Sequence, residues 1–171
     1  KEDGTIDEVE AERMLDHAIE SGVTYIDTAY PYHDGESEPF VGRVLKKYKR
    51  EDFYLATKLP MFKINSLEQA KEIFEEQMKR LDVNYVDFYL LHALNKDTWK
   101  KVLDLNIIPY CEELKKQGRI KNFGFSFHDD YEVFEEIINY HDWDFCQIQL
   151  NYIDTDIQAG MKGYKLAEEK H

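Results

Sequence analysis

Four residues that can hold or move a proton lie at or just after the ends of short apolar segments of the sequence. An ammonium group beside a phenol stabilises the phenolate form, and a carboxylate beside that ammonium holds it in place. A histidine on a neighbouring segment can donate a hydrogen bond to a substrate carbonyl oxygen and orient it. Together such groups suit protonation of a carbonyl oxygen while hydride reaches the carbonyl carbon. The four residues are Asp27, Tyr32, Lys58 and His92.

The apolar segments that position these residues have the pattern of buried parallel strands. They are rich in β-branched and aromatic residues and show little alternation, as expected for strands covered on both faces. Amphipathic helices separate them, and Thr5 with Glu8 and Ser66 with Gln69 fit the capping box that begins a helix. The predicted strands cover residues 23–29, 53–59, 85–92, 121–127 and 145–152.

The rhythm of these strands predicts the architecture. One strand and one helix fill each interval between strand starts, and both an open doubly wound sheet and a closed eight-stranded barrel use that rhythm. No G-x-G-x-x-G follows any predicted strand, which disfavours the open dinucleotide-binding sheet. A closed barrel usually takes about 250 residues, whereas this chain has 171. We therefore predict an α/β fold, an incomplete parallel (β/α)8 TIM-type barrel. Residues 1–171 would form one partial domain with the second to sixth strands, without the first strand and the last two βα units.

The composition excludes several classes of partner. The formal net charge is -13, from 35 acidic and 22 basic side chains, which disfavours nucleic acids and anionic membranes. No segment approaches the roughly 18 consecutive apolar residues of a membrane span, and the opening residues KEDGTIDE lack the apolar part of a signal peptide. Cys111 and Cys146 have no metal-ligand spacing and fit reduced thiols in a cytoplasmic enzyme.

The last two predicted strands bring further polar side chains to the same place. The carboxyl ends of barrel strands meet at one mouth, where the reactive groups of such enzymes lie. Ser126 lies at the end of the fourth predicted strand and His128 just after it, and Gln147 and Asn151 lie in the fifth. Other polar residues expected to shape this mouth, or to be solvated in its loops, are Tyr30, His33, Glu36 and Glu38.

The ordered motifs carry a family resemblance. YIDTAYPYHDGESEPFVG, then LATKLP, then a strand that ends in LLH, resembles the catalytic signature of the aldo-keto reductases. Asp27 and Tyr32 are five residues apart, as in the family pattern. GFSFH and CQIQLNY resemble the family's fifth and sixth barrel strands. The resemblance covers nearly the whole chain.

The resemblance implies reduction of a small-molecule carbonyl, an aldehyde or a ketone, to an alcohol. The cofactor would be NADPH or NADH, with NADPH favoured. Tyr32 would be the proton donor, Lys58 and Asp27 would tune it, and His92 would position the carbonyl group. No metal ligand is implied in these residues.

The resemblance also implies a cofactor contact, with one departure from the family pattern. Ser126 and Gln147 would hold the nicotinamide carboxamide. The family often has Ser-Asn at the fifth strand, whereas Phe127 and His128 follow Ser126 here, so His128 is a candidate for part of this contact. GFSFHD also resembles a prokaryotic branch with iron–sulfur clusters in a C-terminal extension. We expect residues 1–171 alone to be inactive and, with open sheet edges, prone to self-association.

Three other readings remain open from the residues. Asp27, His92 and His128 could bind a metal ion in a barrel hydrolase, which would leave Tyr32 and Lys58 without a role. Lys58 could be a Schiff-base nucleophile, although a nearby carboxylate would keep it protonated. A reductase-like barrel could also serve as a non-catalytic, nicotinamide-sensing subunit.

Overall fold

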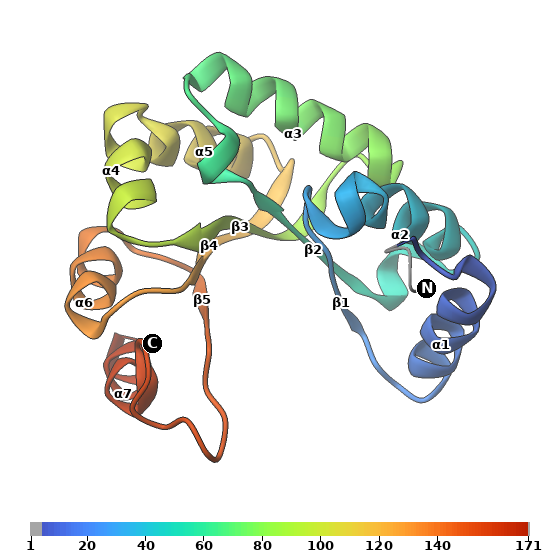
Figure 1. The fold of residues 1–171 in the computed structure, drawn as a ribbon. Helices are drawn as coiled ribbons and strands as arrows, with labels where there is room; N and C mark the ends of the chain where they lie inside the picture. The colour runs from blue at the N-terminus through green and yellow to red at the C-terminus, as the bar shows by residue number, and fades with distance from the viewer. Residues whose placement is uncertain (1–4, 171) are drawn as a thin grey trace.

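Five parallel strands form one curved sheet in the computed structural model, which describes residues 5–170. The strand order is the order of the chain, so each strand pairs with the one before it. The curl of the sheet gives part of a barrel wall, with a concave and a convex side (Figure 1). The strands are β1 (Tyr25–Asp27), β2 (Tyr54–Leu59), β3 (Val86–Leu94), β4 (Ile120–Phe127) and β5 (Phe145–Ile148).

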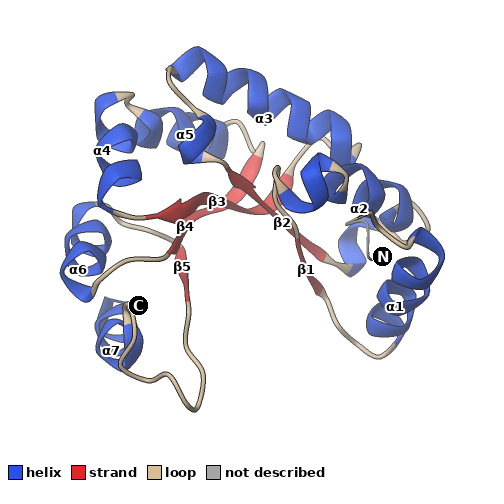
Figure 2. Cartoon of the chain, viewed as in Figure 1, coloured by secondary structure: helices blue, strands red, loops and turns tan. Residues whose placement is uncertain are grey.

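The helices lie along the outer side of this curve (Figure 2). Within the described residues no helix is both long and apolar enough to cross a lipid bilayer. Short 3-10 turns follow β1 and β2, and the first of these, η1 (Tyr32–Gly35), contains the predicted proton donor. The helices are α1 (Glu8–Glu20), α2 (Ser37–Leu45), α3 (Leu67–Leu81), α4 (Lys96–Asp104), α5 (Ile107–Lys116), α6 (Tyr131–Tyr140) and α7 (Gly160–Lys170); the other 3-10 turns are η2 (Arg50–Asp52) and η3 (Met61–Lys63).

The core lies between the sheet and the helices. Successive side chains of a strand point to opposite faces, so every second residue packs under the helices. In β4 these are Phe123 and Phe125, whose rings pack at an angle against Trp143, with centroids 5.2 and 5.0 Å from the centroid of its ring. In β3 the hydroxyl of Tyr89 donates to Gln77 of α3. The alternate residues face the concave side.

An aromatic layer covers the amino-terminal end of the concave side. Phe88 packs edge-on against Tyr25, Tyr54 and Phe145, with ring centroids 5.2, 6.1 and 5.0 Å away. Tyr25 and Tyr54 are 41% and 55% exposed. The polar site residues lie further along the same strands, at the carboxyl ends, so the two ends of this side differ in character.

The predicted partial α/β barrel is confirmed, with local corrections. Half of the predicted capping box at Ser66 is present: its hydroxyl accepts the Gln69 N–H at 3.2 Å, whereas the Gln69 side chain accepts the N–H of Asn65 and not that of Ser66. The predicted capping box at Thr5 is wrong, because α1 begins at Glu8 with Asp7 in the cap position.

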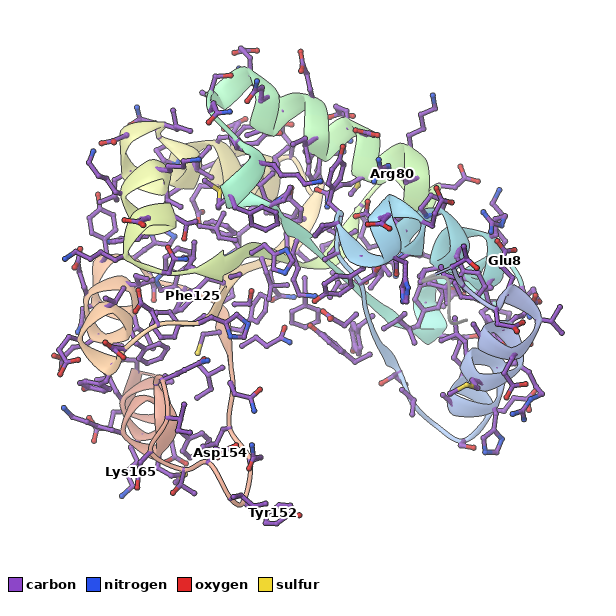
Figure 3. All side chains as sticks on the ribbon, viewed as in Figure 1. Glu8, Arg80, Phe125, Tyr152, Asp154 and Lys165 are labelled. Carbon is purple, nitrogen blue, oxygen red and sulfur yellow. The ribbon has the colours of Figure 1, made fainter. Side chains whose placement is uncertain are left out.

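The fifth strand is shorter than the predicted 145–152. It ends at Ile148, and the Asn151 side chain then accepts the N–H groups of Ile153 and Asp154 in a turn. Ile148 pairs with Phe127, the last residue of β4, so no residue of β4 remains to pair with residues 149–152, which is the physical reason that the strand stops early. Tyr152, which is 93% exposed, lies at the tip of the resulting loop (Figure 3).

Candidate active site

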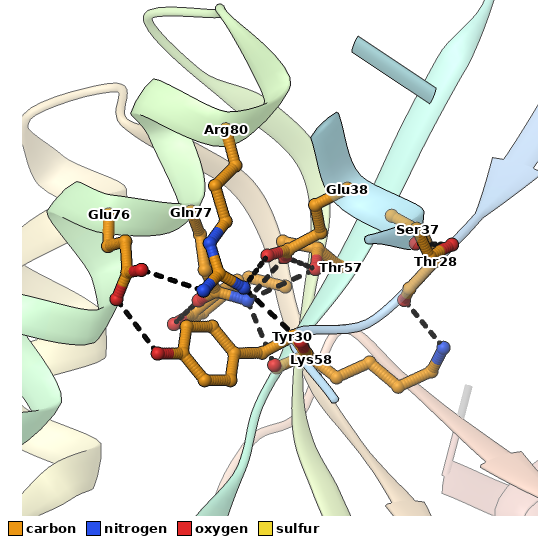
Figure 4. Close-up of polar contacts among 10 residues, drawn as sticks. Thr28, Tyr30, Ser37, Glu38, Thr57, Lys58, Glu76, Gln77 and Arg80 are labelled. Carbon is orange, nitrogen blue, oxygen red and sulfur yellow. Dashed lines mark hydrogen bonds and ion pairs between the residues drawn. The ribbon is translucent and has the colours of Figure 1, made fainter. Parts of the chain in front are cut away.

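Lys58 carries its ammonium group to the concave side at the carboxyl end of β2. Its side chain is 1% exposed, so the charge depends on nearby protein atoms for its stabilisation. Nζ lies 2.6 Å from Asp27 Oδ2 and 2.8 Å from the backbone oxygen of Thr28, the second contact being visible in Figure 4. It lies 3.3 Å from the hydroxyl oxygen of Tyr32. Three acceptors thus match the three N–H donors of the ammonium group.

Tyr32 reaches this ammonium from the loop after β1. The five-residue spacing seen in the sequence lets Asp27, at the end of the strand, and Tyr32, in the loop, contact one Nζ atom. The centroid of the Tyr32 ring lies 4.8 Å from Nζ, and the residue is 38% exposed, so part of it is open to a substrate. The three predicted residues from two strands and one loop therefore meet.

His92 of β3 completes the group. Its ring lies edge-on to that of Tyr32, with ring centroids 5.7 Å apart. The Phe62 ring packs against it at a tilt, with ring centroids 5.8 Å apart. Burial, then the Lys58 ammonium, then His128 lower the pKa of His92 from 6.5 to about 4. The imidazole is therefore neutral near pH 7. Its Nδ1 is buried and has no hydrogen-bond partner among the described residues.

A bulge in β3 lies directly after His92. The pairing register with β4 shifts between Leu91 and Leu94, and Ala93 has a left-handed φ of 51°. A residue other than glycine in this region costs about 1–2 kcal/mol. The Ala93 N–H donates to Ser126 Oγ at 2.8 Å, which offsets part of that cost. Ser126 thus stabilises the backbone beside the histidine.

Ser126 and Gln147 are the predicted contacts for a nicotinamide carboxamide. They are register partners on β4 and β5 and share the concave side. Ser126 accepts from the Ala93 N–H, so its own O–H is left to donate. The Gln147 side chain is exposed and makes no hydrogen bond to any other described residue. A carboxamide offers an acceptor oxygen and an N–H donor, so this hydroxyl and amide fit the group.

His128, also predicted near the mouth, bonds the loop between β5 and α7, and Asn151 makes its bonds within that loop. His128 Nδ1 lies 3.2 Å from the side-chain oxygen of Gln158, and Asn151 holds the turn described above. His128 still affects the site, because it is one cause of the lowered pKa of His92.

The sequence did not indicate that one polar group lies buried behind the site. Glu38, expected at the mouth or in solvent, is fully buried on α2. Its Oε1 accepts from Thr57 Oγ1 at 2.6 Å and from Gln77 Nε2 at 2.8 Å. A glutamate in the polar segment GESEPF carries no local signal of burial, because the burial comes from α3 packing over it.

The comparisons with known proteins agree with this geometry. The model of the aldo/keto reductase family matches residues 1–169. The uncharacterized oxidoreductase YqkF of Bacillus subtilis (strain 168) is 34% identical over 122 residues, which are 66% of this chain and 38% of that protein. The NADH-specific methylglyoxal reductase of Escherichia coli (strain K12) is 26% identical over 159 residues, 80% of this chain and 47% of that protein.

Solved structures give the same result. The aldo-keto reductase AKR11C1 from Bacillus halodurans in its holo form has a TM-score of 0.79 and 29% identity, over 96% of this chain and 55% of that one. An aldo-keto reductase from Klebsiella pneumoniae in complex with NADPH has a TM-score of 0.65 and 26% identity, over 87% and 51%. The chain spans about half, or less, of the length of these proteins. It belongs to the aldo/keto reductase family, whose members are NAD(P)H-dependent oxidoreductases.

Proposed function

We propose that a longer protein containing this chain reduces the carbonyl group of a small aldehyde or ketone with NAD(P)H. The observation that carries the proposal is the contact of Lys58 Nζ with Asp27 and Tyr32, with His92 edge-on to the tyrosine ring. The relative from Escherichia coli is named for methylglyoxal, a small carbonyl compound, which supports the substrate class.

Tyr32 is the proton donor in this proposal. When its proton leaves, negative charge remains on the phenol oxygen, and the Lys58 ammonium 3.3 Å away stabilises that charge. Asp27 holds the ammonium in place through the 2.6 Å contact. The buried position of the lysine strengthens this effect, because little water screens its charge.

His92 orients the carbonyl group as a neutral ring. A buried acceptor without a partner is less unfavourable than a buried N–H without one, so the unpartnered Nδ1 favours the tautomer with the proton on Nε2. The Nε2–H then donates to the carbonyl oxygen and directs it toward the hydroxyl of Tyr32. A neutral histidine does not compete with Tyr32 as the acid.

Ser126 and Gln147 hold the carboxamide of the cofactor, with Ser126 donating to its oxygen and Gln147 accepting from its nitrogen. The nicotinamide ring supplies the hydride when it is bound.

We propose NADPH rather than NADH as the cofactor. Separate measurements of the dissociation constants of the two cofactors test this choice. An iron–sulfur cluster in a C-terminal extension is a hypothesis that iron and sulfide analysis of the full-length protein tests.

The test of the proposed function is Tyr32→Phe in the full-length protein, with methylglyoxal and NADPH as substrates. We expect kcat to fall at least about 100-fold, in line with the loss of a general acid, while the Kd of NADPH is unchanged. Tyr131→Phe is the matched control, because Tyr131 bonds Glu135 on the surface of α6. Equal kcat in Tyr32→Phe and the parent protein contradicts the role of Tyr32.

The structure and the family give no support to the other chemistries. No group of three or more His, Cys, Asp or Glu within residues 5–170 could hold a metal ion, as a barrel hydrolase requires. The ion pair with Asp27 disfavours Lys58 as a Schiff-base nucleophile. The complete set of four acid–base residues favours catalysis over a sensing role.

For residues 1–171 on their own we propose self-association. Tyr25 and Tyr54 of the aromatic layer are exposed on the concave side. Contact between two copies would bury their rings and remove apolar surface from water. Sedimentation velocity tests this, since a monomer at micromolar concentration contradicts it.

A further inference from the structure

The loop that carries Tyr32 continues in an unusual backbone conformation. His33, Asp34 and Gly35 have φ values of 51°, 55° and 93°, so three consecutive residues are left-handed. L-residues other than glycine rarely adopt this conformation, and it persists where surrounding contacts enforce it. The shape of the loop therefore depends on a contact from another element.

Arg80 of α3 supplies that contact. Its guanidinium carbon lies 4.2 Å from the centroid of the Tyr30 ring, and Nη1 donates to the backbone oxygen of Tyr30 at 3.4 Å. The same Nη1 would be 3.4 Å from a Cβ atom added to Gly35. Arg80 thus contacts the loop before Tyr32, as Figure 4 shows for Tyr30, and fills the space beside Gly35 after it.

Two carboxylates hold the guanidinium in this position. Glu76 lies 2.7 Å away on the same helix, and Glu38 Oε2 lies 3.5 Å away on α2. Glu38 is fully buried, and Oε2 has no hydrogen bond within the described residues. Burial raises the pKa of Glu38, while the hydrogen bonds from Thr57 and Gln77 and the positive charge of Arg80 oppose that rise. Arg80 is the cation that compensates this buried carboxyl group.

The other oxygen of Glu38 connects to the strand that carries Lys58. Oε1 accepts from Thr57, the residue before Lys58, and from Gln77 Nε2. Gln77 Nε2 also donates to the backbone oxygen of Lys58 at 3.0 Å. The convex side of β2 is therefore bonded to the same carboxylate that pairs with Arg80.

We propose that the Glu38–Arg80 pair is a positioning unit that sets the Tyr32 loop and the Lys58 strand in register with each other. This inference rests on the proposed function, since it concerns the pairing of proton donor and ammonium. Arg80 fixes the loop and Glu38 fixes the strand, so the 3.3 Å contact between Nζ and the phenol depends on both. Neither residue contacts the substrate.

The first test is Arg80→Met in the full-length protein, assayed with methylglyoxal and NADPH. We expect kcat to fall about 10- to 100-fold, because a small displacement of catalytic groups has effects of that size. We expect KM to change less than about twofold, because Arg80 lies outside the substrate site. Arg119→Met is the matched control: Arg119 also pairs a glutamate, Glu75, and contacts a ring and a backbone oxygen, away from Tyr32.

A double variant separates positioning from stability. Arg80→Met alone leaves the Glu38 carboxyl buried without a cation, so its Tm falls. Adding Glu38→Gln removes that charge and should recover most of the Tm. We expect kcat to stay low in the double variant, because the backbone oxygen of Tyr30 then lacks the N–H that Arg80 donates to it. Recovery of kcat together with the Tm overturns the proposal, since it would show that the pair serves stability alone.

A structural measurement keeps this inference separate from the proposed reaction. Crystal structures of the parent, Arg119→Met and the double variant give the distance between Lys58 Nζ and the Tyr32 hydroxyl directly. We expect that distance to increase by about 1 Å or more, or the loop to leave its left-handed conformation, in the double variant alone. An unchanged distance and loop overturn the inference, even if the protein reduces no carbonyl. Absence of carbonyl reduction in the parent, with the expected displacement in the double variant, refutes only the proposed function.

Discussion

The charge state of His92 gives the sharpest test of the site electrostatics, and Lys58→Met is the perturbation that tests it. Burial, Lys58 and His128, in that order, lower the pKa of His92 to about 4. Methionine keeps much of the volume of the lysine and removes its charge. We expect the pKa of His92 to rise in this variant and to stay below 6.5, because burial, the largest cause, remains.

The size of the effect follows from the two pKa values. The difference between 6.5 and about 4 corresponds to about 3 kcal/mol against the protonated ring, and partial exposure of the ring reduces this to about 2 kcal/mol. At pH 7 His92 is almost entirely neutral, because its pKa of about 4 lies well below that pH. In the proposed reaction, neutral His92 orients the carbonyl group through a hydrogen bond and does not transfer a proton to it.

The assay is an NMR titration of the histidine ring signals of the full-length protein from pH 3.5 to 8, with His92 assigned by a His92→Gln variant. Lys63→Met is the control, since Lys63 is exposed and lies over the Tyr30 ring. Two results would refute the reasoning: a His92 that titrates at or above 6.5 in the parent, or one that titrates at the same pH in Lys58→Met and the parent.

The same pKa fixes the sign of a pH effect on stability. Between pH 4 and 6.5 the unfolded chain binds the proton more readily than the folded chain, because the folded pKa of His92 is the lower one. The free energy of unfolding therefore falls as the pH decreases through this window, by about 2 kcal/mol from His92. Urea unfolding of the parent and His92→Gln should show a smaller acid loss in the variant; parallel curves would contradict the prediction.

The remaining predictions concern the sheet and the isolated chain. Ser126→Ala should lower the free energy of unfolding by about 1–2 kcal/mol, measured by urea unfolding, because the Ala93 N–H loses its acceptor. Gly124→Ala should cost about 3 kcal/mol in the same assay, because its Cβ would lie 2.3 Å from the backbone oxygen of Phe145; an unchanged midpoint would show that β5 gives way. Residues 1–171 alone should show no NADPH-dependent carbonyl reduction, and measurable turnover would contradict this.

The strands and the meeting of the four acid–base residues could be predicted because both follow from local patterns. A buried parallel strand has an apolar signature, and the carboxyl ends of such strands meet at one edge. Asp27, Lys58 and His92 needed only their positions on successive strands to be brought together. Tyr32 lies in a loop, and the spacing from Asp27 that placed it there came from family resemblance.

The shortened β5 and the false helix start at Thr5 show where local patterns fail. In the first case β4 ends at Phe127, the register partner of Ile148, so the apolar pattern of residues 149–152 has no neighbouring strand to pair with. In the second, a capping-box match three residues ahead of the helix did not decide where the first turn forms. The end of a strand depends on where its partner strand ends, and the start of a helix depends on the backbone conformation of the residues before it; sequence spacing alone gives neither.

Glu38 could not be predicted as buried, because its environment is made by residues far away in the sequence. Thr57 and Gln77 are 19 and 39 positions from it, and Arg80 is further still. Adjacent residues of β2 point to opposite sides, so Thr57 bonds Glu38 under the helices while Lys58 faces the phenol. One strand therefore links a polar network on its convex side to the acid–base pair on its concave side. A search for the determinants of this site has to include the layer behind the sheet, where no substrate contact would reveal them.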